Sequence, residues 1–263
     1  MLTGKFTLYY NYTKGGMNLA QYTTEAIVLG ARNWGDADKI IQLFSRQKGK
    51  LRASAFGCRR PKSALSGPLQ MFHVLDVTLN EGERVDTVRQ AVVKKRFPKL
   101  SSDIDAMAYG AFIAELVLEM MPEGEPQEKI YDWLLGVFDA CGARNPRIVA
   151  LIAGWQMMEL AGVGPKYETC AHCGKEITGQ AFFDAAEGGA LCNECAGGVP
   201  AHQYTPDVRG FLAKISAIDF NDLPSFHVKK DELLGAESLL LCTLEEILGK
   251  RLKSISFLSQ IGM

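Results

Sequence analysis

Four cysteines stand in two pairs that have the spacing of a zinc site. The pairs are Cys170-x2-Cys173 and Cys192-x2-Cys195, and 18 residues separate them. Two CxxC turns can present four thiolates to one tetrahedral ion, and a spacer of this length is typical of zinc ribbons. Four thiolates leave no coordination position for water, so the sequence predicts one structural Zn²⁺ rather than a catalytic one. Four free thiols, or a redox pair, are the alternative.

A second group of residues is suited to binding phosphate. The predicted loop at residues 57–67 reads GCRRPKSALSG and places Arg59, Arg60 and Lys62 close together. The forked guanidinium group of arginine matches the oxygen atoms of a phosphate, so we predict that this loop contacts DNA. The charge of neighbouring segments adds four further candidates: Arg52, Lys94, Lys95 and Arg96. A solvated basic surface is the alternative.

Aromatic side chains near these cations are candidates for stacking on bases. Four such residues are available: Trp34, Phe56, Phe72 and Phe97. Aromatic rings bind single strands by stacking on the bases. Taken one at a time, each ring is expected in the hydrophobic core, and a stacking role is the alternative.

The charge of the chain is divided unevenly along the sequence. The net charge is −1, but residues 17–100 hold 15 Lys and Arg against 7 Asp and Glu, whereas residues 101–263 hold 12 against 23. Between Asp38 and Asp76 the sequence has eight cations and no acidic residue. Such asymmetry indicates that the N-terminal part binds a polyanion and that the rest has another task.

The sequence lacks the common signatures of catalysis. It has no GxxxxGK[ST] phosphate loop, no HExxH and no GxSxG, and its histidines show no metal or triad spacing. The acidic pairs Asp36-x-Asp38 and Asp103-x-Asp105 could in principle bind Mg²⁺. We therefore expect no catalytic site and keep two alternatives: a metal-dependent nuclease or other nucleic-acid enzyme, and a zinc-ribbon adaptor that binds only proteins.

The N-terminal part has the pattern of a small β-domain. Short apolar and alternating stretches with turn residues between them predict five strands, at residues 23–29, 39–44, 51–56, 71–79 and 85–93. Residues 32–36 are predicted as a turn. With no helix long enough for a parallel crossover, these strands favour a five-stranded OB-type barrel, a fold whose face and loops bind oligonucleotides.

The remainder of the chain has the periodicity of helices. One is predicted from a Ser102 cap to residue 121, a second over residues 127–141, and a third from an Asn145 cap to Gly162. Thr205 is expected to cap a further helix, and residues 231–248 form a long amphipathic one.

These predictions give an α+β chain of several domains. We expect a flexible N-terminal extension at residues 1–21, an OB-fold DNA-binding domain at 22–98 and a helical domain at 99–263. The four-cysteine module is expected at residues 167–200 as an insertion in the helical domain. An odd number of cysteines, four of them paired for metal, favours a reducing compartment.

Several of these segments together resemble the RecO family of bacterial recombination mediators. The stretch Gly57-Cys-Arg-Arg-Pro-Lys-Ser-Ala-Leu-Ser-Gly-Pro-Leu-Gln-Met-Phe72 is similar to the signature of that family. The opening Glu25-Ala-Ile-Val-Leu, Asp36-Ala-Asp38 and Lys48-Gly-Lys50 resemble it too, as does the order of barrel, helical domain and four-cysteine insertion. The resemblance covers residues 22–258, and residues 1–16 have no counterpart in it.

The resemblance implies a role in DNA repair without catalysis. Proteins of this family bind single- and double-stranded DNA, anneal complementary strands, and act with RecR to help RecA replace the single-strand-binding protein SSB. They also bind the acidic, apolar C-terminal tail of SSB on the helical domain. The matched motif carries DNA contact onto Arg59, Arg60 and Lys62, while the other four cations rest on charge alone. It further implies a place in the bacterial cytoplasm, at the nucleoid.

Overall fold

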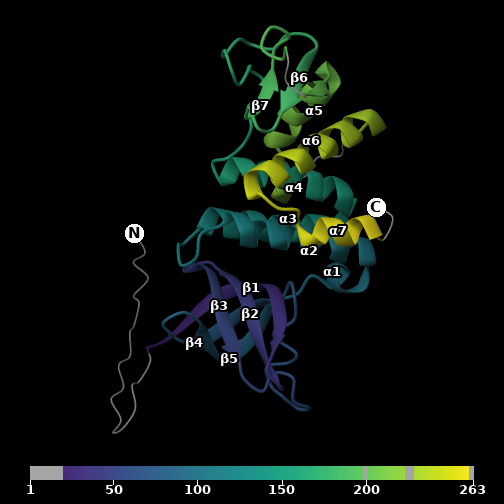
Figure 1. The fold of residues 1–263 in the computed structure, drawn as a ribbon. Coiled ribbons are helices and arrows are strands. Elements are labelled where there is room, and N and C mark those ends of the chain that lie inside the picture. The colour runs from purple at the N-terminus through teal and green to yellow at the C-terminus, as the bar shows by residue number, and fades with distance from the viewer. Residues whose placement is uncertain (1–19, 198–200, 223–227, 261–263) are drawn as a thin grey trace, which may run out of the picture. The chain divides into compact units, whose positions relative to one another are not determined.

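The computed structural model describes residues 20–197, 201–222 and 228–260. The chain divides into two compact units, one formed by residues up to 98 with residues 121–132, the other by 99–120 and 133–263 (Figure 1). Most of the extension predicted at residues 1–21 lies outside the described residues, as do residues 198–200 of the predicted metal module.

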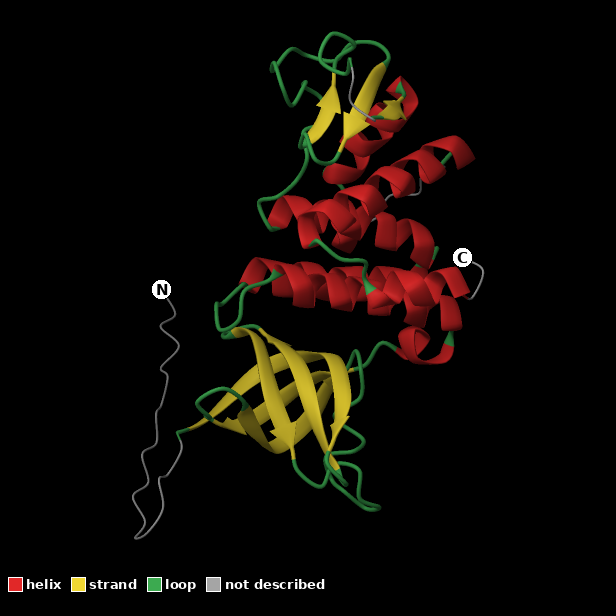
Figure 2. Cartoon of the chain, in the orientation of Figure 1, coloured by secondary structure: helices red, strands yellow, loops and turns green. Residues whose placement is uncertain are grey.

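The first unit is a closed five-stranded barrel, which confirms the predicted fold (Figure 2). Its strands are β1 (Gln21–Trp34), β2 (Asp38–Ser45), β3 (Gly49–Ala55), β4 (Val74–Asn80) and β5 (Asp86–Lys95). They close in the order β1-β2-β3-β5-β4, and only β3 and β5 run parallel. Buried and exposed residues alternate along β3, and the inward side chains of all five strands fill the core.

Two boundaries predicted for the strands are wrong. Residues 32–34 were expected in a turn but continue β1, because they pair in register with the first residues of β2. The fourth strand begins at Val74 rather than Met71, because Phe72 has a left-handed backbone, with φ of 69°, that interrupts an extended chain. The basic loop is therefore longer than the sequence indicates and extends to His73.

A segment between two helices completes the first unit. Residues 121–132 lie against β3, where the Gly124 N–H donates to the Lys50 carbonyl at 3.0 Å. Gly49 makes this approach possible, because a Cβ at that position would lie 1.8 Å from the carbonyl oxygen of Glu125. The contact covers part of the edge that β3 leaves open beyond its two residue pairs with β5.

The second unit is mainly helical. Its helices are α1 (Pro98–Ser102), α2 (Ile104–Met120), α3 (Glu128–Ala143), α4 (Pro146–Leu160), α5 (Pro206–Ser216), the short 3-10 helix η1 (Phe220–Asp222), α6 (Lys230–Leu248) and α7 (Lys253–Gln260). The first residues of α1 and α3 belong to the first unit. Helix α4 is buried over ten successive residues, 149–158, as expected for a helix surrounded by others.

Helix ends follow the predicted caps in two of three cases. Asn145 accepts the N–H of Arg147 at 3.0 Å, and Thr205 accepts the N–H of Val208 at 3.3 Å. The prediction of Ser102 as a cap is wrong. Asp103 takes that place, because its carboxylate accepts the N–H groups of residues 105 and 106, both at 3.0 Å.

The four-cysteine module holds a small sheet in the order β7-β6-β8. Its strands are β6 (Ala181–Asp184), β7 (Gly189–Leu191) and β8 (His202–Tyr204). Phe183 of β6 is fully buried and meets Trp155 of α4 edge to face, with ring centroids 6.5 Å apart. The module is thus joined to the helices by an aromatic contact as well as by the chain.

Helices able to cross a membrane were sought among the described residues. None of the helices there is both long enough and apolar enough to do so.

Candidate nucleic-acid interface and metal centre

The start of the basic loop is fastened to the hairpin that joins β1 and β2. The N–H of Gly57 donates to the Asp38 carboxylate at 2.7 Å, and the N–H of Arg59 donates to the Ala37 carbonyl at 2.8 Å. The Arg59 guanidinium also donates to the hairpin carbonyl of Asp36 at 3.2 Å. The loop and the hairpin therefore form one continuous surface at this end of the barrel.

The rest of the loop is anchored by buried groups. Cys58 and Leu69 are 1% exposed and belong to the barrel core. At its far end the N–H of Phe72 donates to the Val28 carbonyl at 2.8 Å, and the Val28 N–H donates to the His73 carbonyl at 3.0 Å. Burial raises the pKa of the Cys58 thiol, so this cysteine is a packing residue and not a reactive thiolate.

The three loop cations identified from the sequence point to solvent. Arg59, Arg60 and Lys62 are all exposed. Within the described part of the chain none of them takes part in an ion pair, so their charge is not neutralised by carboxylates of the protein. Lys62 has a left-handed backbone, with φ of 68°, in the turn at this point of the loop.

The other four candidate cations stand in different surroundings. Arg52 pairs with Glu123 at 3.1 Å, and Lys94 pairs with Glu25 and, at 3.6 Å, with Asp76. Lys95 lies over the ring of Phe97, 4.9 Å from its centroid. Arg96 is exposed. Because Lys95 pairs with Val74, the end of β5 lies where the basic loop rejoins the barrel.

Glu25 is the centre of an ionic cluster within the first unit. It bonds Lys94 and also Arg46, whose guanidinium is 3.4 Å away and makes a two-pronged contact with Asp132. Burial acts to raise the pKa of Glu25, but the hydrogen bond and charge of Lys94, together with hydrogen bonds of Tyr131 and Arg46, hold the pKa below its usual value. Arg46 is thus occupied in holding segment 121–132 to the barrel.

The four aromatic candidates separate into two pairs. Phe72 and Phe97 are 3% and 4% exposed, so they belong to the core, as expected for each taken alone. The same expectation is wrong for Trp34 and Phe56, whose side chains are 54% and 61% exposed. Trp34 ends β1 and Phe56 follows β3, so both lie beside the basic loop.

The four cysteines come together as the spacing predicts. Their sulfur atoms all lie within 4.8 Å of one another, and Cys173 Sγ is 3.8 Å from Cys192 Sγ. Tetrahedral Zn²⁺ with Zn–S bonds of about 2.3 Å requires sulfur atoms about 3.8 Å apart. The four thiols therefore fit a zinc ion, which Cys170, Cys173, Cys192 and Cys195 would hold with no position left for water.

Two tight turns bring these thiols into position. Gly174 follows the first pair with φ of 74°, and its N–H donates to the Cys170 carbonyl at 2.9 Å. In the second turn the N–H of Cys195 donates to the Cys192 carbonyl at 3.0 Å. Burial acts to raise the pKa of Cys170, but hydrogen bonds from backbone groups of this cluster lower the pKa to about 6. The pKa of Cys195 is raised, first by its hydrogen bond with Cys192, because without a metal the four thiols share their protons, whereas a bound metal requires thiolates.

Family models match both parts of the chain. Residues 17–97 match the model described as "Recombination protein O N terminal", and residues 101–255 match "Recombination protein O C terminal". The chain belongs to the RecO family. The first match covers the barrel and its basic loop, and the second runs from the end of α1 to the first residues of α7 and includes the four-cysteine module.

Two of three curated relatives match this chain over nearly their whole length, and the third matches about two thirds of it. A DNA repair protein RecO of Desulforudis audaxviator is 32% identical over 93% of this chain and 99% of its own length. One of Anaeromyxobacter dehalogenans is 31% identical over 90% and 95%. One of Pelotomaculum thermopropionicum is 36% identical over 66% of this chain and 68% of its own.

In this RecO-family chain, one carboxylate of each acidic pair has a structural role. The Asp38 carboxylate accepts the Gly57 N–H, and the Asp103 carboxylate caps α2. Among the described residues, the four cysteines are the one group of three or more His, Cys, Asp or Glu side chains that could hold an ion.

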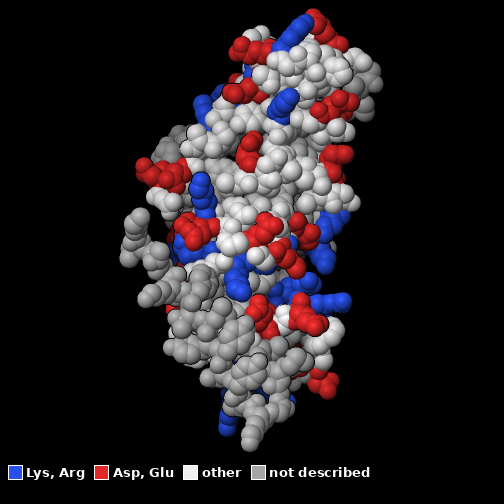
Figure 3. Space-filling view, turned by 90° about the vertical axis from the view of Figure 1, so that its left-hand side faces the viewer, with Lys and Arg blue, Asp and Glu red and all other residues white. Residues whose placement is uncertain are grey.

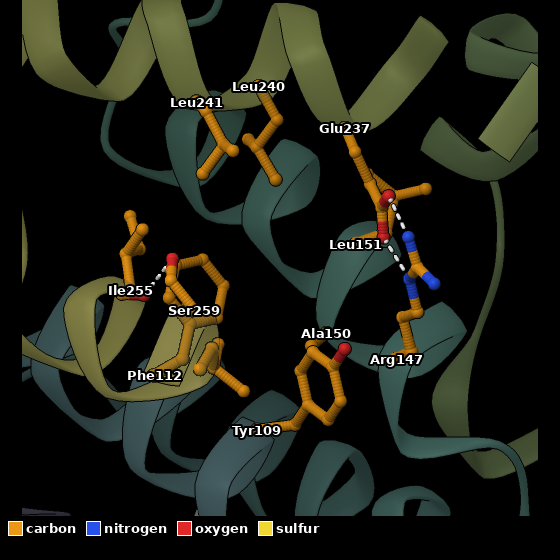
Figure 4. A pocket seen from close by; sticks show the side chains of 11 residues that line it. Tyr109, Phe112, Arg147, Ala150, Leu151, Glu237, Leu240, Leu241, Ile255 and Ser259 are labelled. Carbon is orange, nitrogen blue, oxygen red and sulfur yellow. Dashed lines mark hydrogen bonds and ion pairs between the residues drawn. The ribbon is translucent and has the colours of Figure 1, made fainter. Parts of the chain in front are cut away.

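The second unit contains a pocket that the sequence analysis did not predict. It has a volume of about 150 Å³, and a wall of apolar side chains from α2, α4, α6 and α7 surrounds it (Figure 4). Its lining residues are Tyr109, Phe112, Arg147, Ala150, Leu151, Glu237, Leu240, Leu241, Ile255, Leu258 and Ser259. No local pattern predicts this pocket, because its residues come from four helices and α2 and α4 are far in the chain from α6 and α7.

The pocket has one charged pair at its rim. Arg147 donates to both carboxylate oxygens of Glu237, each at 2.6 Å (Figure 4).

Elsewhere, on the face of the second unit that Figure 3 shows, acidic side chains are interspersed with basic ones. This face therefore offers no continuous positive surface to a phosphate chain.

Proposed function

We propose that this protein is a non-enzymatic mediator of DNA repair and homologous recombination that binds single- and double-stranded DNA through the basic loop of its barrel. The observation that carries the proposal is the set of three exposed loop cations, Arg59, Arg60 and Lys62, which no carboxylate of the described chain neutralises. Unpaired cations can take the place of the counterions on a phosphate backbone, and their release favours binding.

The anchoring of the loop supports this role. Backbone bonds to the hairpin at one end and to β1 at the other hold the cations in place before DNA arrives. Less conformational entropy is then lost on binding. Arg52 and Lys94 must leave a carboxylate partner before they can contact phosphate, so we assign them a smaller contribution. Lys95 and Arg96 lie where the loop rejoins the barrel and can extend its positive surface.

The proposed reaction is one of binding and exchange. A protein that holds two complementary strands by their backbones, while leaving the base edges free, brings them together for annealing. With RecR, the protein would help RecA replace SSB on single-stranded DNA. We place this work at the nucleoid of the bacterial cytoplasm, where the DNA lies. The zinc ion of the four-cysteine module would be structural, since its ligands fill the coordination sphere.

The pocket of the second unit is our candidate for the C-terminal tail of SSB. Its apolar wall suits the apolar part of that tail, and Arg147 at the rim offers a guanidinium to a carboxylate. A tail bound there would bring SSB-coated DNA to the same molecule whose barrel binds DNA.

A salt titration tests the DNA proposal. Affinity for a single-stranded oligonucleotide should fall steeply as salt rises, with a log-log slope of roughly 0.7 for each phosphate contact. The triple change Arg59→Ala, Arg60→Ala, Lys62→Ala should reduce the slope by about two. Arg52→Ala is the comparison, because Arg52 is already paired with Glu123, and it should reduce the slope by less than one loop cation does. An unchanged slope in the triple variant would overturn the loop assignment.

The two alternatives predict different results. A nuclease would cleave labelled DNA with Mg²⁺ and lose that activity with Asp36→Ala or Asp38→Ala. A zinc-ribbon adaptor would show no salt-sensitive affinity for DNA. Either outcome would replace the proposal.

A further inference from the structure

Two large aromatic side chains are exposed at the end of the barrel that holds the basic loop. Trp34 is 54% exposed and Phe56 is 61% exposed. In the first unit, the other large apolar side chain exposed to such an extent among the described residues is Val92 on β5, at 51%. Exposed apolar side chains that gather at one place, rather than being scattered singly, mark binding sites, so this placement points to a ligand.

The strand register places the two rings in one row. Trp34 pairs with Asp38 across β1 and β2, and Asp38 in turn accepts the N–H of Gly57, the residue after Phe56. Trp34 at the end of β1 and Phe56 directly after β3 therefore lie on either side of Asp38, the first residue of β2. Two strand spacings separate them, which corresponds to roughly 10 Å between backbones.

Positive charge surrounds this row. The guanidinium of Arg32 lies over the Trp34 ring, 5.2 Å from its centroid, and the Arg59 guanidinium bonds the hairpin carbonyls next to it. The carboxylate of Asp38 is engaged by the loop backbone, which leaves Asp36 as the exposed acidic group of the hairpin. Aromatic faces flanked by unpaired arginines match a ligand that has flat bases and a charged backbone.

We propose that Trp34 and Phe56 form a base-stacking platform that makes this end of the barrel selective for unpaired DNA bases. The inference rests on the proposed function and deepens it by naming the strand state that the site prefers. The loop cations contact phosphate in either state, but only a single strand has base faces that can leave the stack and lie on the rings. A duplex is bound by its backbone alone.

The test is a comparison of single- and double-stranded DNA with matched variants. Trp34→Ala and Phe56→Ala are each expected to weaken binding to a single-stranded oligonucleotide by about fivefold or more, with less than twofold change for a duplex. Trp34→Phe and Phe56→Tyr keep a ring and should keep most of the affinity. Phe257→Ala is the control, because it removes an exposed aromatic side chain from the second unit, which holds neither the basic loop nor the two rings. Thermal melting verifies that each variant is folded.

Other outcomes separate this inference from the proposed function. Equal affinity of the alanine variants and the parent for single strands would overturn the platform, even if the triple loop variant loses DNA binding. An equal loss for single strands and duplex would also overturn it. Unchanged DNA binding together with a lost RecR contact would assign the two rings to a protein interface instead. If the triple loop variant also binds DNA normally, the proposed function fails too.

Discussion

The guanidinium of Arg147 and the carboxylate of Glu237 face each other at the rim of the apolar pocket, joined by two hydrogen bonds of 2.6 Å. Both side chains are less than 40% exposed, and the hydrogen bond and charge of Glu237 raise the pKa of Arg147. Arg147 is the one cationic residue of the pocket lining, and Glu237 is its ion-pair partner. An acidic peptide that binds there must compete with a carboxylate of the protein itself.

Removing the Glu237 charge should strengthen binding of the SSB tail. We expect Glu237→Gln to raise the affinity for a labelled SSB tail peptide several-fold, because a neutral amide holds Arg147 less strongly than a carboxylate does. Arg147→Ala should lower the affinity by about tenfold, and the double variant should behave like Arg147→Ala. Fluorescence anisotropy at fixed salt measures all three. Equal affinities across the series would show that Arg147 does not hold the peptide.

Gly49 should be indispensable for the contact between the barrel and segment 121–132. A methyl group there would lie 1.8 Å from the Glu125 carbonyl oxygen, so Gly49→Ala must push segment 121–132 away from β3. The same change strains the backbone of residue 49, whose φ is 61°. Gly35→Ala is a matched control, since its φ is 54° and nothing lies within 4 Å of the added methyl group. We expect about 1–2 kcal/mol of destabilisation for the control and clearly more for Gly49→Ala. Urea unfolding of both variants checks this, and equal losses would contradict it.

The sequence predicted the features that depend on local pattern. Alternating residues such as those of β3 defined the barrel, and the spacing of the four cysteines defined the metal module. It did not predict which cations would meet acids. Arg46 and Asp132 are 86 positions apart, and only the folded chain brings them together. The same holds for Arg52 and Glu123. The charge count placed Arg52 in the basic N-terminal part and Glu123 in the acidic remainder of the chain, but the fold pairs them.

The role of the aromatic rings also depended on the fold. Phe56 and Phe72 flank the same loop in sequence, yet one is exposed and the other is buried. Phe72 points inward where its left-handed backbone ends the loop. No local sequence pattern predicts a positive φ at a phenylalanine. The pocket was missed for a related reason, since its wall is shared by four helices.

Stability of the first unit should depend on the ionisation of Glu25. Its pKa is lowered in the folded protein, so the unfolded chain binds a proton more readily. The stabilising contribution is therefore complete above the ordinary pKa of a glutamate, about 4.3, and is lost as the pH falls through the folded value. We expect Glu25→Gln to destabilise the protein by about 1–2 kcal/mol at pH 7 and by less at pH 4.

Asp76→Asn provides the comparison for Glu25. Asp76 also pairs with Lys94, but it is 49% exposed and 3.6 Å away, whereas Glu25 is 21% exposed. An exposed pair contributes little, so Asp76→Asn should change stability by less than about 0.5 kcal/mol. Denaturant unfolding between pH 4 and pH 7 measures both. A Glu25→Gln effect that is the same at the two pH values would contradict the assignment.

Loss of the metal should unfold the cysteine turns while the barrel keeps its DNA affinity. The protein as purified should contain one zinc per chain by elemental analysis, and Cys173→Ser or Cys192→Ser should reduce that content. The sheet of the module retains buried groups of its own, Phe183 and Tyr204, which pack with centroids 5.8 Å apart, so we expect local rather than global unfolding. Limited proteolysis should cut within residues 167–197 after chelation. Cys242→Ser controls for loss of a thiol outside the cluster, and protein without zinc would contradict the assignment.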